Sequence, residues 1–201
     1  MQPKTQYMER FIMQDLIAWK NREDRKPLIL LGARQVGKTY ILKEFGQREF
    51  ENVAYINCDN NAMAKDLFAS DYNIDRILLT IGAITGVNIE AGKTLIIMDE
   101  IQELHRGLAS LKYFCENARE YHVAVAGSLL GLALHQGESY PVGKVNTLEM
   151  YPMTFEEFLW ARGFKQRMDL LQHGMWDVVK SLRTLYIQHL REYYLVGGMP
   201  E

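Results

Sequence analysis

The chain has 201 residues, and its 23 lysines and arginines are nearly balanced by 25 aspartates and glutamates. A formal net charge of −2 excludes a protein with a positive field over its whole surface, although a local nucleic-acid-binding patch stays open. The N-terminus is polar, and no apolar run approaches the ~20 residues that a membrane span needs. We therefore expect a cytoplasmic protein that does not contact a membrane.

Apolar segments typical of buried strands alternate with segments whose apolar residues recur at helical spacing. The first helix is expected over residues 6–20, and the charged residues 21–26 end it. Strands are expected at 28–32, 53–57, 94–98, 123–126 and 145–150, and the intervening helices at 40–50, 62–70, 74–84 and 103–120. Continuous apolar runs of this length fit strands that are covered on both faces. The alternation predicts an α/β fold, with a parallel five-stranded sheet between layers of helices.

Beyond residue 150 the pattern changes to helices alone, which are expected at 155–161 and 178–195. Two glycines and a proline, Gly197, Gly198 and Pro200, end the second of them. We therefore expect three parts: an N-terminal helix that packs on the core (1–26), the α/β core (27–150) and a helical lid (151–201).

The first strand leads into the motif G-x-x-x-x-G-K-T, which predicts the phosphate-binding loop of a P-loop NTPase. Glycines let the backbone turn its N–H groups toward phosphate oxygens, and the following helix adds its N-terminal dipole. Lys38 is expected to reach the β- and γ-phosphates as a catalytic residue, and the Thr39 hydroxyl to bind Mg²⁺. Arg34 either contacts phosphate or a neighbouring subunit, or is a solvated side chain. The expected nucleotide-binding residues of the loop are Gly32, Ala33, Arg34, Gln35, Val36, Gly37, Lys38 and Thr39.

Two adjacent carboxylates, Asp99 and Glu100, follow the third expected strand. Asp99 is expected to help hold the metal ion, as the second acidic element of P-loop enzymes does. Glu100 points the other way along the chain, so we expect it to orient and deprotonate an attacking water molecule. A second carboxylate of this kind favours a hydrolase over a kinase that acts on small molecules.

Polar residues also close two other strands. Ser128, after the fourth strand, is a catalytic contact to the γ-phosphate or water, the N-cap of the next helix, or both. Asn57, at the end of the second strand, either hydrogen-bonds to Glu100 or closes a turn. Charge on the transferred phosphate needs a further cation, an arginine finger, from this chain or a neighbour. The candidates are Lys144, Arg162 and Arg183, and the alternative for each is ordinary surface charge.

These motifs together resemble the AAA-superfamily ATPases of bacteria and archaea. The resemblance rests on GARQVGKT at 32–39, DEIQ at 99–102, YPMTFEEFL at 151–159 and GGMPE at 197–201. It implies ATP as the nucleotide, kinship with the archaeal-ATPase and signal-transduction NTPase clade, and the strand order 5-1-4-3-2. Pro200, in a Gly-x-Pro turn of the lid, is then expected beside the adenine. The resemblance also implies a nuclease-like C-terminal domain beyond this chain. Family members usually carry an arginine at the position where this chain has Lys144.

The leading functional hypothesis is Mg²⁺-dependent ATP hydrolysis that drives a conformational change, in a homo-oligomer or with a protein partner that supplies the finger. The alternative is a nucleotide-gated binding module with little turnover. The sequence disfavours transfer of phosphate to a small molecule, because no lid of clustered arginines is present. Nucleic acid stays an open partner that the overall charge does not support.

Overall fold

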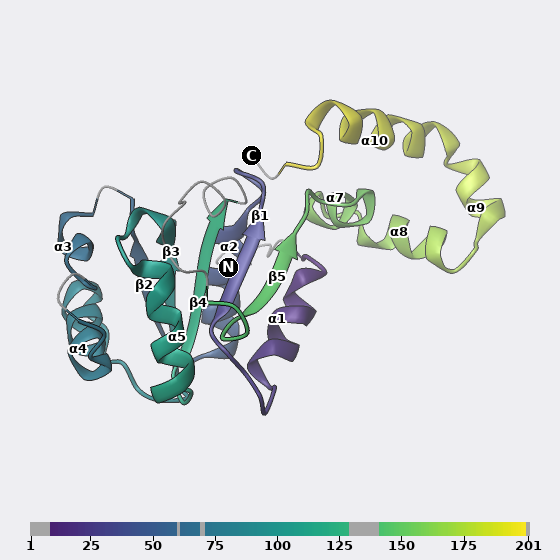
Figure 1. The fold of residues 1–201 in the computed structure, drawn as a ribbon. Coiled ribbons are helices and arrows are strands. Elements are labelled where there is room, and N and C mark those ends of the chain that lie inside the picture. The colour runs from purple at the N-terminus through teal and green to yellow at the C-terminus, as the bar shows by residue number, and fades with distance from the viewer. Residues whose placement is uncertain (1–8, 60, 69–70, 129–140, 200–201) are drawn as a thin grey trace.

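The sheet of the protein has five parallel strands in the order β2-β3-β4-β1-β5 (Figure 1). The computed structural model describes residues 9–59, 61–68, 71–128 and 141–199. The strands are β1 (Leu28–Gly32), β2 (Asn52–Asn57), β3 (Thr94–Asp99), β4 (His122–Ser128) and β5 (Asn146–Met150). This is the expected order 5-1-4-3-2 read from the other edge, so both the fold class and the strand order are confirmed.

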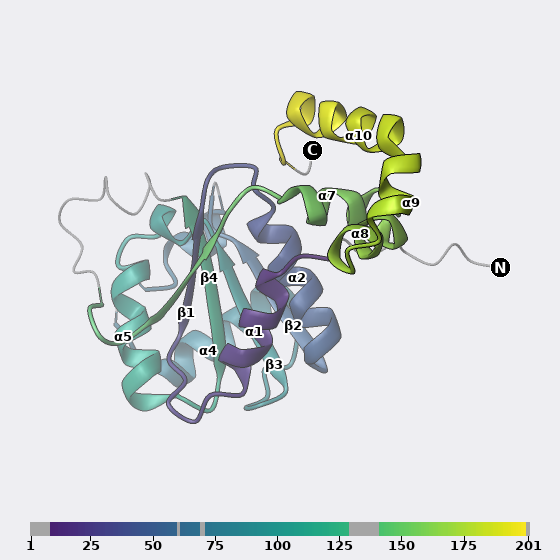
Figure 2. The same ribbon diagram turned by 90° about the vertical axis from the view of Figure 1, so that its right-hand side faces the viewer.

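Helices cover both faces of the sheet, because successive strand residues point to opposite sides (Figure 2). On one face, Leu28 and Leu30 pack with residues of α1 (Ile12–Lys20) and α2 (Lys38–Glu49). On the other, Ile29 packs with residues of α4 (Ile74–Thr85) and α5 (Gly107–Asn117), and the short α3 (Ala62–Lys65) joins the same core. The three strand residues are fully buried. The sheet is therefore the middle layer of a three-layer core.

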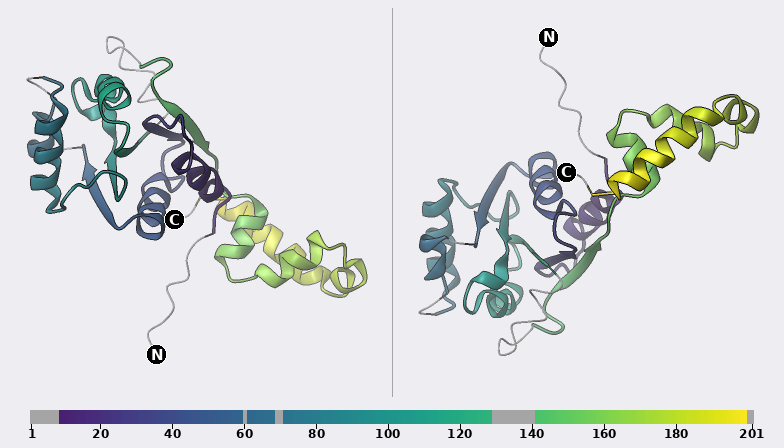
Figure 3. Two further views of the ribbon diagram at one scale, coloured as in Figure 1. Left: turned by 90° about the horizontal axis from the view of Figure 1, so that it is seen from below. Right: turned by 90° about the horizontal axis from the view of Figure 1, so that it is seen from above.

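A helical lid extends from the core beyond β5 (Figure 3). It comprises α7 (Phe155–Ala161), α8 (Lys165–Gln172), α9 (Trp176–Ser181) and α10 (Arg183–Val196). After α10 the chain returns to the start of the lid, where Met153 N donates to Gly198 O at 2.7 Å, and Met199 packs against the core. Gly198 has a φ of 71°, and a Cβ there would lie 2.6 Å from Met153 O, so only glycine fits this contact. The lid leaves and rejoins the core at neighbouring points.

Several expected helices differ from the observed ones. The helix expected at 178–195 is two helices, α9 and α10, which meet at Leu182, and α8 was not expected. The helix expected at 62–70 ends at Lys65, and the one at 103–120 is the shorter α5, preceded by the 3-10 turn η1 (Ile101–Glu103). Each helix within the described ranges is too short or too polar to span a lipid bilayer.

Candidate functional site

The phosphate loop lies between β1 and α2 and has the curled backbone that its sequence predicts. Gln35 and Gly37 have positive φ angles of 65° and 97°, so the chain turns sharply before α2 begins at Lys38. A Cβ on Gly32 would lie 2.5 Å from Met150 O, so this position has room only for glycine beside β5. The turn directs the loop backbone toward the N-terminus of α2, where an anion is favoured.

Lys38 bends back over this loop. Its Nζ donates to Gly32 O at 3.0 Å and to Ala33 O at 2.8 Å, and the residue is 7% exposed. Burial lowers the pKa of Lys38, while the carboxylates of Glu100 and Asp99 act in the opposite direction. The ammonium group therefore already lies among the loop carbonyls, close to the place where a phosphate would bind.

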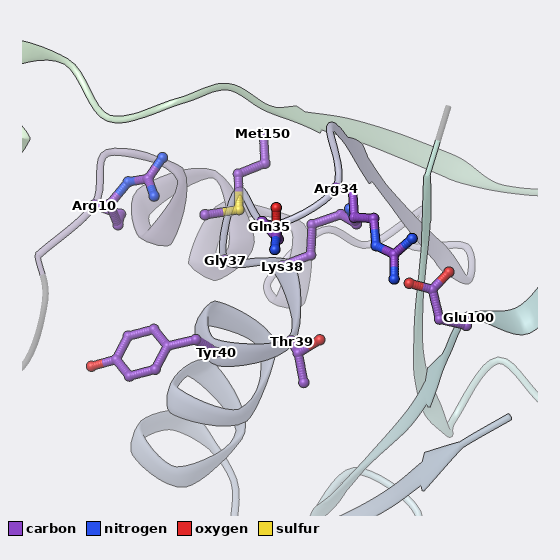
Figure 4. Close-up of a pocket in the computed structure, with 9 residues that line it drawn as sticks. All are labelled: Arg10, Arg34, Gln35, Gly37, Lys38, Thr39, Tyr40, Glu100 and Met150. Carbon is purple, nitrogen blue, oxygen red and sulfur yellow. The ribbon is translucent and has the colours of Figure 1, made fainter. Parts of the chain in front are cut away.

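A cavity of about 290 Å³ opens beside the loop and brings it together with Glu100 (Figure 4). Its lining comprises Arg10, Arg34, Gln35, Gly37, Lys38, Thr39, Tyr40, Glu100 and Met150. Arg34 points toward Glu100 in the close-up, whereas Tyr40 lies at the other end, near Met150 and Arg10. The sequence did not identify Arg10, Tyr40 or Met150, since each lies outside the defined positions of the motif.

Asp99 accepts hydrogen bonds from two hydroxyl groups that lie on other elements. Thr39 Oγ1 donates to its Oδ2 at 2.5 Å, and Tyr55 OH, on β2, donates to the same oxygen at 3.2 Å. Lys43 Nζ lies 3.5 Å from the centre of the Tyr55 ring. Burial, with the charge of Asp99, raises the pKa of Tyr55 to about 12, so the phenol keeps its proton and acts as the donor.

The Thr39–Asp99 contact fits a magnesium site. A hydroxyl and a carboxylate are the oxygen ligands that this hard cation prefers, and the two oxygens already lie in contact at the end of the sheet. Asp99 is 5% exposed, so its charge is shielded from bulk water. The residues present can therefore hold Mg²⁺.

Glu100 lies directly after β3 with φ 52° and ψ 47°, a left-handed conformation that is uncommon for glutamate. It lines the cavity, and its Oε2 accepts a hydrogen bond from Gln102 Nε2 at 2.5 Å. Asn57 does not fill this role: its Oδ1 accepts from the Asp59 backbone at 2.9 Å, and within the described residues its amide NH₂ makes no hydrogen bond to Glu100. Of the two interpretations of Asn57, the structure supports the turn.

The structure covers one expected site residue, Ser128, only in part and another, Pro200, not at all. Ser128 is the last residue of β4 and lies in register with Gly32, at the edge of the sheet that carries the phosphate loop. Its side chain, the helix expected after it and Pro200 lie outside the described residues. Their roles stay predictions.

The candidate finger residues lie away from the cavity. Lys144 precedes β5, at the opposite edge of the sheet from the phosphate loop, and its Nζ is 2.8 Å from Glu116 Oε1. Arg162 caps α7, and its Nη2 lies 3.6 Å from Glu192 Oε2. Arg183 begins α10 in the lid. None of the three is among the described residues that line the cavity.

Arg10 connects the phosphate loop to the start of the lid. Its Nη1 donates to Val36 O at 3.3 Å, its Nη2 donates to Tyr151 O at 2.6 Å, and its Nε lies 3.1 Å from Glu157 Oε1. The same Glu157 oxygen accepts from Phe11 N at 2.8 Å. Both charged side chains are almost fully buried, so the pair is a rigid link between the loop, the end of β5 and α7.

Known structures share this fold. The ADP form of the Orc2 protein of Aeropyrum pernix aligns with a TM-score of 0.52 and 15% identity, over 83% of this chain and 54% of that one. A RuvB mutant of Thermotoga maritima aligns with a TM-score of 0.50 and 19% identity, over 84% of this chain and 52% of that one. At such identities the likeness establishes the fold alone.

Sequence comparison gives the family. An uncharacterized protein of Methanocaldococcus jannaschii is 30% identical over 202 residues, which cover 88% of this chain but only 39% of that relative. Residues 24–159 match the family model of an AAA domain. The match and the fold support nucleotide binding. Because the matched segment covers about two thirds of the chain, the protein belongs to the AAA domain family, whose members are P-loop ATPases.

Proposed function

We propose that this protein binds ATP with Mg²⁺ and hydrolyses it, and that the nucleotide state changes the position of the lid. One observation carries the proposal: the Thr39–Asp99 contact and the Glu100 carboxylate lie at the same phosphate loop, around Lys38. A loop that binds phosphate, a cation site and a carboxylate for water are the parts that phosphoanhydride hydrolysis needs.

Each residue of this group has a chemical role in the proposal. Lys38 would exchange its bonds to the Gly32 and Ala33 carbonyls for bonds to the β- and γ-phosphates. Thr39 and Asp99 would hold Mg²⁺, which neutralises charge on the phosphates when bound. Glu100 would accept the proton of the attacking water, as a carboxylate within hydrogen-bond reach of the substrate can.

The far end of the cavity suits the nucleoside. Tyr40 and Met150 offer an aromatic ring and a thioether against which a base can pack, at a distance from the carboxylates. We keep Pro200 as a further neighbour of the adenine, on the resemblance alone. The choice of ATP over other nucleotides likewise rests on the family and not on a contact.

Arg10 can transmit a movement of the phosphate loop to the lid. This side chain contacts the phosphate loop at Val36 and the lid at Tyr151 and Glu157, so a shift of the loop on nucleotide binding would also move α7. We keep the division into an N-terminal helix (1–26), a core (27–150) and a lid (151–201) as part of this proposal.

A finger from another molecule completes the proposal. Since none of the three candidate cations lines the described cavity, we propose that a second copy or a protein partner supplies the charge, with Ser128 as a further contact to the γ-phosphate or water. The cytoplasm is the proposed location, from the sequence composition.

Phosphate release from ATP by the purified protein, with Mg²⁺ and then with excess EDTA, tests this function. We expect steady release with Mg²⁺ and its loss with EDTA. Tight nucleotide binding without any release would contradict hydrolysis and favour the nucleotide-gated module.

A further inference from the structure

The position of Glu100 depends on more than the strand that precedes it. Asp99, the last residue of β3, faces Thr39, whereas the left-handed backbone at Glu100 turns the next side chain into the cavity. In the close-up its carboxylate lies near the end of Arg34 (Figure 4). A side chain of this length at a chain reversal has several rotamers, so a second contact is needed to fix the carboxylate.

Gln102 makes that second contact from the 3-10 turn η1. Its Nε2 donates to Glu100 Oε2 at 2.5 Å, and the residue is only 9% exposed, in a turn where Ile101 and Leu104 are buried as well. The amide orientation follows from its neighbour, because a carbonyl oxygen in place of the NH₂ group would repel the carboxylate. The buried amide and the carboxylate are therefore held together.

The other end of this amide finds no partner among the described residues. Gln102 Oε1 is buried and has no hydrogen-bond partner in the part of the chain that the structure describes. A buried polar atom without a partner opposes folding, and a methionine or leucine would fill this space without that penalty. The glutamine therefore stabilises the fold less than an apolar residue would. This indicates that its remaining contact, to Glu100, serves the site.

We propose that Gln102 is a positioning residue that holds one oxygen of Glu100, so that the other oxygen faces the water to be activated. This inference rests on the proposed function. A carboxylate with one oxygen bound to a rigid, buried donor cannot rotate freely, and its second oxygen keeps one direction. Asn57, the residue at the end of the neighbouring strand, makes no hydrogen bond to Glu100 in the described part of the chain and does not share this task.

The test compares Gln102→Met with the parent in single-turnover hydrolysis of Mg·ATP. Methionine keeps the length and fills the buried space but cannot donate. We expect the rate of the chemical step to fall about 10-fold to 100-fold, while nucleotide affinity changes less than about twofold. Glu103→Gln, on the exposed face of the same turn, is the matched control and keeps the parental rate.

A double-mutant cycle separates positioning from a merely structural effect. In the Glu100→Gln background, Gln102→Met should have no further effect on the rate, because the group that it positions is gone. Should Gln102→Met unfold in a thermal melt, Gln102→Asn, which withdraws the amide by one methylene, takes its place in the same comparison. If the parent hydrolyses ATP and the Gln102 variant is equally active, the inference about Gln102 is wrong but the proposed function stands. The same holds if Gln102→Met lowers the rate by the same factor in the parent and in the Glu100→Gln background. A parent that does not hydrolyse ATP contradicts the proposed function, on which the inference about Gln102 rests.

Discussion

Thr39 Oγ1 donates a hydrogen bond to Asp99 Oδ2 over 2.5 Å, between residues that lie 60 positions apart in the sequence. The strands that carry them toward each other, β1 and β3, are not neighbours, since β4 lies between them. The contact forms because α2 starts directly after the phosphate loop and packs across β3 and β4. The parallel sheet thus brings a hydroxyl and a carboxylate to one place at its carboxyl edge.

Replacing Asp99 with asparagine should abolish most of the gain in nucleotide affinity that Mg²⁺ provides. The amide keeps the shape but loses the charge that attracts the cation, so we expect the Mg²⁺-dependent gain to fall about tenfold or more. Titration with a fluorescent ATP analogue, with Mg²⁺ and with EDTA, measures this gain. The affinity in EDTA should stay near that of the parent. An unchanged Mg²⁺ effect would remove Asp99 from the metal site; Asp75→Asn, at an exposed position, is the control.

Replacing Lys38 with methionine should weaken nucleotide binding itself. The variant keeps the apolar length of the side chain but loses the ammonium group that now bonds to Gly32 and Ala33. Loss of a charge-assisted hydrogen bond costs about 1.5–3 kcal/mol, which corresponds to about a 10-fold to 100-fold rise in Kd. The same titration measures it. Lys112→Met, at an exposed position of α5, should bind like the parent, and equal affinities in all three proteins would contradict the role of Lys38.

Replacing Arg10 with alanine should destabilise the whole protein. The change leaves Glu157 buried without its partner and removes two hydrogen bonds to backbone carbonyls. Breaking one side of a buried ion pair costs about 3–5 kcal/mol, which urea unfolding detects as a lower midpoint. The exposed pair Arg22–Asp24 supplies the control, since Arg22→Ala should change the midpoint little. Equal midpoints for both variants would show that Arg10 is not a structural link.

Acid should weaken the fold through His122. This residue is 5% exposed, and burial, with the charges of Arg25 and Lys20, lowers its pKa to about 4. An unfolded histidine titrates near pH 6.5, so between these values the unfolded chain binds a proton that the folded chain does not. The contribution of neutral His122 to the free energy of unfolding is complete above about pH 6.5. It is lost as the pH falls toward 4, by up to about 3 kcal/mol.

Urea unfolding of the parent and of His122→Gln at pH 7 and pH 4.5 checks this linkage. Both proteins lose stability in acid through other groups, but the parent should lose more, because glutamine takes up no proton in this range. The same loss in both proteins would mean that His122 titrates normally in the folded chain.

The sequence predicted the core better than the lid. The inner strands β1, β3 and β4 are buried on both faces and therefore read as nearly continuous apolar runs, while the edge strand β5 alternates between partly buried and exposed residues. The strand order came from the family resemblance. Helix α8 was missed because none of its residues is buried, so no apolar stripe marks it. The break at Leu182 has no glycine or proline to announce it, and the apolar spacing continues across it.

The site could be anticipated only where a motif or a strand end carries the signal. Lys38, Thr39, Asp99 and Glu100 lie together because parallel strands end at one edge, which the sequence order implies. Arg10 gives no such signal, since its partners Tyr151 and Glu157 are more than 100 residues away and the contact depends on where the lid begins. The contact of Gln102 depends on the left-handed backbone at Glu100, which no residue type in the segment requires.

Hydrolysis at this site is tested most directly by single-turnover conversion of Mg·ATP to ADP, in the parent and in Glu100→Gln. The parent should convert the bound nucleotide, and the variant should bind ATP with an affinity within about twofold while its rate falls about 100-fold or more. A Glu100→Gln protein that turns over at the parental rate, or a parent that binds ATP and never converts it, would contradict the assignment of Glu100 as the base of an ATPase.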